Sequence, residues 1–157
     1  MRGGSRLLAA LATAALLAGT AGCGSDSSQE SDKDAGEKFS SVADQSTCLA
    51  DATAAATPWP DGFPDDWPFP ARTTAYNVED RGADGVIVTA VTGSVFKDVL
   101  AFMNKDVADA GYEVESGETE EHDAEAEWTG NGYRGRWAIR ESAQCPGETV
   151  IQVLSTH

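Results

Sequence analysis

The stretch from Asp123 to Arg140, DAEAEWTGNGYRGRWAIR, determines how the rest of the chain is interpreted. Acidic residues alternate with alanine and tryptophan before its central turn, and arginines alternate with aromatic and aliphatic residues after it. Strict alternation is typical of half-buried strands, because successive side chains of a strand point to opposite faces. Asn131-Gly132 suits the positive φ angles of a tight hairpin turn. The stretch therefore predicts a β-hairpin with one aromatic and one charged face.

Two registers fit this hairpin. A four-residue loop pairs Glu127 with Arg134, Glu125 with Arg136 and Glu121 with Arg140, whereas a two-residue loop pairs Glu127 with Arg136 and Asp123 with Arg140. Both place acids opposite arginines on one face and leave Trp128, Tyr133 and Trp137 on the other, so the assignment of faces does not depend on the register.

One amphipathic helix is predicted from Ser94 to Ala110, with Ser94 as its N-cap and Gly111 at its C-terminal cap. Its apolar residues recur at spacings of three and four and form one stripe, which we expect to meet the aromatic face of the hairpin. They are Val95, Phe96, Val99, Leu100, Phe102, Met103 and Val107.

Four further strands complete the predicted domain, at Thr73–Val78, Val86–Thr92, Tyr112–Glu115 and Thr149–Ser155. With the hairpin and the helix they give the order ββαββββ. We expect an α+β fold, a two-layer sandwich of a mostly antiparallel sheet with one main helix on one face. A weakly helical N-terminal segment is expected over residues 37–57.

The segment from Pro58 to Pro70, PWPDGFPDDWPFP, is named the Pro-aromatic segment here. Its five prolines exclude a helix or a central strand and predict an extended, irregular course. Trp59, Phe63 and Trp67 are its candidates for contact with a partner or ligand. The alternative is that these rings fill the core, since a domain of this size needs large residues there.

The first 22 residues predict a cleaved signal peptide. Arg2 and Arg6 precede an uncharged stretch of 12 residues, Leu7 to Ala18, which is shorter than the roughly 20 apolar residues of a membrane-spanning helix. The junction Thr20-Ala21-Gly22-Cys23 resembles the lipobox of bacterial lipoproteins, although that family usually has leucine where this chain has Thr20. The resemblance implies lipidation of Cys23. The alternative is an ordinary cleavage near Ala21, which leaves Cys23 as a free thiol.

The cysteine count favours lipidation. The chain has three cysteines, and an odd thiol in an exported protein needs an explanation. If Cys23 carries a lipid, Cys48 and Cys145 remain as an even pair in an oxidising compartment, where a disulfide is the usual outcome.

Residues 24–36, GSDSSQESDKDAG, contain a single apolar residue and predict a disordered acidic tether between the lipidated cysteine and one domain over residues 37–157. Without the leader the chain has 9 basic and 26 acidic residues, a net charge of −17. This charge argues against nucleic acid as a partner and against electrostatic docking to anionic lipid. Contact with the membrane is therefore expected only through the lipid on Cys23.

The layout resembles a group of small, uncharacterised lipoproteins of high-GC Gram-positive (actinobacterial) bacteria. The resemblance rests on the lipobox, the acidic Ser-rich tether, the sequence FPDDWPFP and the helix end DAGYEV. It implies an extracytoplasmic lipoprotein on the outer side of the cell membrane, and it brings no known activity with it.

The sequence offers little catalytic chemistry. His157 is the last residue, His122 begins a strand, and Ser94 lacks the surroundings of a nucleophile elbow. Eight acids lie between Glu113 and Glu127, yet alternation along a strand spreads them apart, so a solvated face is expected rather than a metal site. We expect no catalytic residue, metal or cofactor.

The expected function is a non-enzymatic, membrane-anchored module that binds a protein or a component of the cell envelope. The alternative is a small-ligand or glycan-binding lipoprotein that uses exposed tryptophans. Neither the partner nor the oligomeric state follows from the sequence.

The leader and the odd cysteine count together predict the effect of Cys23→Ala. The variant is expected to leave the membrane fraction for the medium or to persist as uncleaved precursor. Metabolic labelling with an alkynyl fatty acid, followed by fractionation, measures this. Label on the Cys23→Ala protein would contradict lipidation at this residue.

Overall fold

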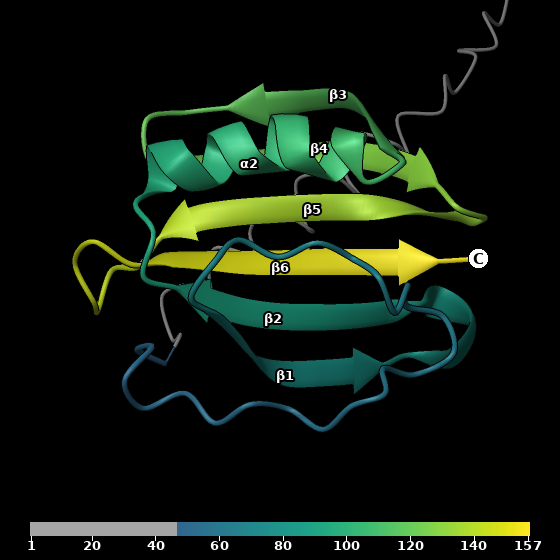
Figure 1. Cartoon of the computed structure of the whole chain (residues 1–157), viewed down its shortest axis with the longest axis horizontal. Coiled ribbons are helices and arrows are strands. Elements are labelled where there is room, and N and C mark those ends of the chain that lie inside the picture. The colour runs from purple at the N-terminus through teal and green to yellow at the C-terminus, as the bar shows by residue number, and fades with distance from the viewer. Residues whose placement is uncertain (1–46) are drawn as a thin grey trace, which may run out of the picture.

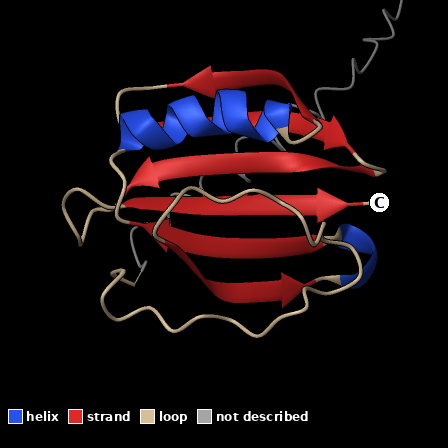
Figure 2. Ribbon diagram, in the orientation of Figure 1, coloured by secondary structure: helices blue, strands red, loops and turns tan. Residues whose placement is uncertain are grey.

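The computed structural model describes residues 47–157, which form a six-stranded sheet with a helix packed on one face (Figure 1). The elements are β1 (Thr73–Asp80), the 3-10 helix η1 (Gly82–Asp84), β2 (Val86–Thr92), α2 (Phe96–Asp109), β3 (Tyr112–Thr119), β4 (Asp123–Gly130), β5 (Tyr133–Glu141) and β6 (Thr149–Thr156). Adjacent strands follow the order β1-β2-β6-β5-β4-β3, and every pair is antiparallel. The α+β class and the element order ββαββββ are confirmed (Figure 2).

The β4–β5 hairpin has the register of the two-residue loop. Gly130 pairs with Tyr133, Glu127 with Arg136 and Asp123 with Arg140. Both loop residues have positive φ, 52° at Asn131 and 87° at Gly132, as an Asn-Gly turn allows. The four-residue alternative is therefore wrong, because Asn-Gly closes the hairpin without further residues.

The aromatic face of the hairpin is buried as predicted. Trp128 and Trp137 are 0% and 1% exposed and share one core cluster with Phe96 and Met103 of α2. Tyr133 is only partly buried, and its ring lies 4.4 Å from the ring of His157. The first face of the sheet, named here as the face that carries Trp128 and Trp137, therefore forms the core.

Helix α2 packs on this first face along a narrower stripe than the sequence suggested. Its buried residues are Phe96, Val99, Met103 and Val107, while Val95 is 50% exposed. The predicted cap at Ser94 is wrong, because Val95 occupies the N-cap position and no side chain caps the helix. The Ser94 carbonyl instead accepts a hydrogen bond from Thr149 Oγ1 at 2.9 Å, which ties the start of α2 to β6.

The Pro-aromatic segment is the second element on the first face. In Figure 1 it crosses in front of β6 and β2 on the same side of the sheet as α2. Phe63 and Trp67 are 2% and 5% exposed and belong to the same core cluster as Val86 and Val88 of β2. Helix and segment thus divide the first face, and the segment supplies the aromatic volume that a second helix would otherwise provide.

Residues 47–57 do not form the helix that the sequence suggested. They contain a turn near Leu49 and then an extended run whose Ala55 amide donates to the Ala75 carbonyl of β1 at 2.8 Å. The remainder of the predicted N-terminal helical segment, residues 37–46, lies outside the described residues, as do the leader and the tether.

The buried indoles predict an asymmetry between the faces of the hairpin. Trp137→Ala is expected to lower the free energy of unfolding by about 3–5 kcal/mol, because it removes a large buried ring. Arg134→Ala, a truncation of an exposed residue on the same strand, is expected to change it by less than about 0.5 kcal/mol. Urea unfolding of both variants measures the difference. Equal, small effects would show that Trp137 is not a core residue.

Candidate functional site

The disulfide links the start of the described chain to the loop before β6. Cys48 is bonded to Cys145, and their Cα atoms lie 5.7 Å apart, within the range usual for disulfides. The predicted pairing is confirmed. The bond joins residues 97 apart in sequence, so it ties the start of the described chain to the loop that leads into β6, a strand in the middle of the sheet.

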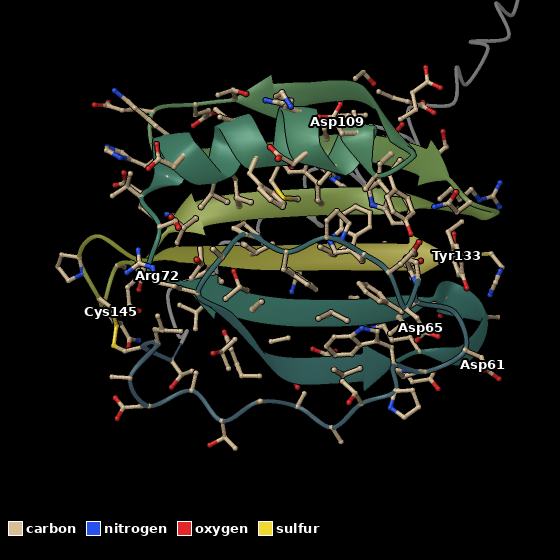
Figure 3. All side chains as sticks on the ribbon, viewed as in Figure 1. Asp61, Asp65, Arg72, Asp109, Tyr133 and Cys145 are labelled. Carbon is tan, nitrogen blue, oxygen red and sulfur yellow. A yellow bond between two sulfur atoms is a disulfide. The ribbon has the colours of Figure 1, made fainter. Side chains whose placement is uncertain are left out.

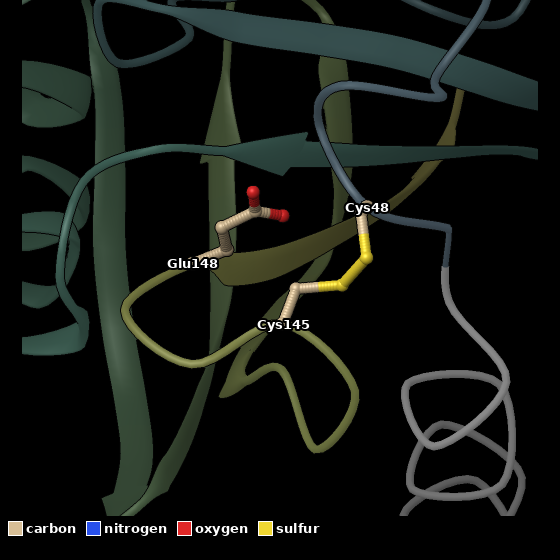
Figure 4. Close-up of side chains that lie close together, drawn as sticks. All are labelled: Cys48, Cys145 and Glu148. Carbon is tan, nitrogen blue, oxygen red and sulfur yellow. A yellow bond between two sulfur atoms is a disulfide. The ribbon is translucent and has the colours of Figure 1, made fainter.

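A carboxylate accompanies this disulfide. Glu148 Oε2 accepts a hydrogen bond from the Leu49 amide at 2.8 Å, and a carboxylate oxygen of Glu148 lies within 4.8 Å of both sulfur atoms (Figure 4). Within residues 47–157, Cys48, Cys145 and Glu148 form a group of suitable metal-ligand types. The two sulfur atoms are bonded to each other and provide no thiolate, so the oxidised group is not a metal site.

The loop that carries Cys145 and Glu148 is held by its own hydrogen bonds. The Cys145 amide donates to Ser142 Oγ at 3.1 Å, the Glu148 amide to the Cys145 carbonyl at 3.1 Å, and the Ser142 amide to the Glu148 carbonyl at 2.9 Å. These bonds place the Glu148 side chain beside the disulfide. Glu148 was not among the residues predicted for a site, because nothing in the spacing from Cys145 to Glu148 indicates that its side chain turns back toward Leu49.

The aromatic residues proposed to contact a partner are mostly in the core. Phe63 and Trp67 are buried, and only Trp59 of the three is partly exposed. Trp67 packs against Tyr112 and Trp128, with ring centroids 4.9 and 4.5 Å apart. The sequence-based assignment of Phe63 and Trp67 to a contact surface is therefore wrong, and a glycan site built on these rings loses two of its three members.

Tyr112 connects the Pro-aromatic segment to β3. Its hydroxyl donates a hydrogen bond to Asp66 Oδ1. Burial, together with this hydrogen bond, raises the pKa of Tyr112 to about 12. The exposed carboxylates Asp61 and Asp65 are carried by the same segment (Figure 3). Asp66 therefore fixes the segment over the core, whereas Asp61 and Asp65 add surface charge.

The second face of the sheet, named here as the face opposite α2, carries the charges of the hairpin. Arg136 forms an ion pair with Glu125, and the two side chains are only 23% and 27% exposed. This pair is more buried than the solvent-exposed pairs that the sequence predicted. It lies diagonally across the hairpin, because Glu125 pairs directly with Ala138. The arginines thus neutralise part of the carboxylate charge on β4.

Strand β3 is the acidic edge of the sheet. It is the last strand in the sheet order, and every residue from Glu115 to Thr119 is exposed. Glu113, Glu115 and Glu118 lie on it, and Glu118 pairs with another carboxylate, Glu125. The opposite edge, β1, is partly covered by the Ala55 hydrogen bond described above. The two edges of the sheet therefore differ in both coverage and charge.

Within residues 47–157, His122 does not lie in surroundings suited to acid–base catalysis. His122 Nδ1 lies 3.0 Å from Glu141 Oε2, and the histidine side chain is 62% exposed. A solvent-exposed pair of this kind contributes little and does not create the enclosed site in which a histidine acts as a base.

Comparison with known proteins assigns no family, since no family model, curated protein or solved structure matches the chain. Within the described residues, no helix is both long and apolar enough to cross a membrane.

Loss of the Cys48–Cys145 disulfide is expected to destabilise the domain strongly. Cys48→Ser/Cys145→Ser is expected to lower the free energy of unfolding by about 4–5 kcal/mol, because the bond closes a loop of roughly 100 residues in the unfolded chain. Urea unfolding of this variant and the parent, both with Cys23→Ser, measures the effect. Titration of two free thiols in the unfolded, unreduced parent would contradict the disulfide.

Proposed function

We propose that the chain is a lipid-anchored, extracytoplasmic binding module without enzymatic activity, and that it captures a protein partner along strand β3. The observation that carries this proposal is the exposed β3 edge, whose far side has no neighbouring strand among residues 47–157. A strand at a sheet edge offers unpaired backbone N–H and C=O groups, and an extended peptide can add to it as a further strand.

The charge of this edge determines which partner it fits. Glu113, Glu115 and Glu118 carry formal charges that no basic residue on β3 balances, and the whole chain has a net charge of −15. A second copy of the chain would bring like charges together along the strand. An extended segment with Lys or Arg on alternate residues would place its cations on the same face as these carboxylates, because strand side chains alternate.

The shift in pairing between Val114 and Gly117 defines the length of the docking strand. The β3–β4 register is irregular there, as expected for a bulge. Bulges and charges protect natural sheet edges against indiscriminate pairing. Strand addition is therefore expected over a few residues rather than over the whole of β3, with modest affinity and strong dependence on ionic strength.

A lipid anchor would compensate for the modest affinity of this short docking strand. Lipidation at Cys23 would confine the domain to the membrane surface, and the acidic tether would let it turn toward its partner. Confinement raises the local concentration of a weak binder relative to partners in the same layer. A lipid anchor would therefore let a short, charged docking strand bind a partner in the same layer despite its modest affinity.

A designed peptide tests the docking strand. A fluorescent peptide of alternating Lys and Val is expected to bind the chain, and Glu113→Lys/Glu118→Lys is expected to weaken binding at least about tenfold by reversing the charge of the edge. The matched control is Asp61→Lys/Asp65→Lys, the same change of charge on exposed residues of the Pro-aromatic segment. Fluorescence anisotropy at two salt concentrations measures the dissociation constants.

The same peptide with N-methyl groups on alternate residues separates strand addition from charge attraction alone. It keeps the charge but loses backbone donors, so it is expected to bind much more weakly. Equal binding of the methylated peptide, or equal weakening by the control variant, would overturn docking at the β3 edge.

A further inference from the structure

The two sulfur atoms of the disulfide differ in their surroundings. Cys48 is partly exposed, whereas Cys145 is 7% exposed and lies in a loop closed by its own hydrogen bonds. A thiol–disulfide exchange begins with attack of a thiolate on one sulfur, and access decides which sulfur is attacked. Exposure therefore favours attack on Cys48 Sγ.

The Glu148 carboxylate lies close to both sulfur atoms of the disulfide, the one that is attacked and the one that is released. Its carboxylate is oriented by the Leu49 amide at 2.8 Å, and an oxygen is within 4.8 Å of each sulfur (Figure 4). The hydrogen bond, which has an ionised acceptor, holds the carboxylate in this position. Any negative charge that forms on either sulfur would thus lie close to an existing negative charge.

We infer that Cys48 Sγ is a thiol-exchange site and that Glu148 selects the incoming thiol by charge, so that cationic thiols react faster than anionic ones. The incoming thiolate, RS⁻, forms a bond to Cys48 Sγ as the Cys48–Cys145 bond breaks. The electron pair leaves on Cys145 Sγ, which then takes a proton from water. The external thiol is the reductant, and the product is a mixed disulfide between its sulfur and Cys48.

Two electrostatic effects act in the same direction. The carboxylate repels the approaching thiolate, and it also repels the negative charge that leaves on the buried Cys145 sulfur. Like charges about 5 Å apart change a rate by roughly 4-fold at the dielectric constant of water and by more where water is excluded, and a positively charged tail on the thiol offsets part of this repulsion. The disulfide is therefore slow to open and selective in what opens it.

Opening of the disulfide would change how the segment around Cys48 is held to the rest of the domain. The bond holds Cys48 to the loop before β6, and its opening would leave the hydrogen bond from the Leu49 amide to Glu148 Oε2 to hold this segment to the loop. Small acidic thiols would open it slowly, whereas a thiol reagent or protein with a positively charged surface would open it faster. The site thus discriminates between classes of reductant by charge.

Three thiols with different tails test this selectivity on the full chain carrying Cys23→Ser. Mercaptoethanesulfonate is anionic, mercaptoethanol neutral and cysteamine cationic, and second-order rate constants are compared per thiolate. The parent is expected to react with cysteamine about tenfold or more faster than with mercaptoethanesulfonate. Glu148→Gln, which keeps an oxygen for the Leu49 amide, is expected to accelerate all three reactions and to reduce the ratio to about 3 or less.

Glu121→Gln provides the matched control, because it removes the same charge from an exposed residue at the β3–β4 turn. It is expected to leave both the rates and the ratio unchanged. Alkylation of partly reacted protein followed by mass spectrometry is expected to find the thiol tail on Cys48.

Three results would overturn the inference. A tail found mainly on Cys145 would show that exposure does not select the attacked sulfur. A ratio that Glu148→Gln leaves unchanged, or that Glu121→Gln reduces equally, would remove the role of Glu148. Rates that do not depend on thiol concentration would show that the bond opens only after the domain unfolds.

Discussion

Burial of the indole rings of Trp128 and Trp137 is the constraint on which the rest of the structure depends. The two rings occupy the first face where α2 meets the Pro-aromatic segment, and Trp67 packs directly on Trp128 with centroids 4.5 Å apart. Large rings of this kind bury far more apolar surface than the alanines that alternate with the acids on β4. The position of α2 on one half of the sheet and of Trp67 beside it both follow from covering these two indoles.

The alternation of side chains along β4 that buries the indole of Trp128 also determines which face of the sheet carries the acidic residues. A shift of one residue in the β4 register would exchange the faces and bury Asp123, Glu125 and Glu127. Correct packing of the core therefore forces these carboxylates onto the second face, where Arg136 pairs with Glu125. Since β5 carries the arginines and β3 carries none, the neutralisation decreases toward the β3 edge. The acidic edge used in the proposed function is thus a consequence of the core.

The sequence predicted the parts of this structure that depend on local periodicity. Strand alternation, the spacing of α2 and the Asn131-Gly132 turn are local signals, and the element order follows from them. The Pro-aromatic segment could not be assigned in this way, because proline excludes regular structure without indicating where the rings go. Trp67 is buried through contacts with Tyr112 of β3 and Trp128 of β4, both far along the chain. Glu148 was missed for a related reason, since its partner is the amide of Leu49, 99 residues away. Ser94 was assigned as a helix cap from residue type alone, yet its carbonyl accepts a hydrogen bond from Thr149, 55 residues away, and local sequence does not indicate this contact.

The position of the disulfide has a mechanical consequence for a domain held by its N-terminus, as the proposed anchor requires. A force on the N-terminal segment reaches Cys48 first and passes through the bond to Cys145, four residues before the start of β6 at Thr149. Strand β6 is paired along its length on both sides, with β2 and β5, so the force acts on the middle of the sheet rather than on an edge. Without the bond, the same force would act on residues 49–72 and would pull the Pro-aromatic segment away from Trp128, since those residues are held by isolated contacts such as the Ala55–Ala75 hydrogen bond and the packing of Trp67. The Glu148 carboxylate would slow the opening of the disulfide. A pulling force would then continue to act on β6 and not on the segment that covers the buried indoles.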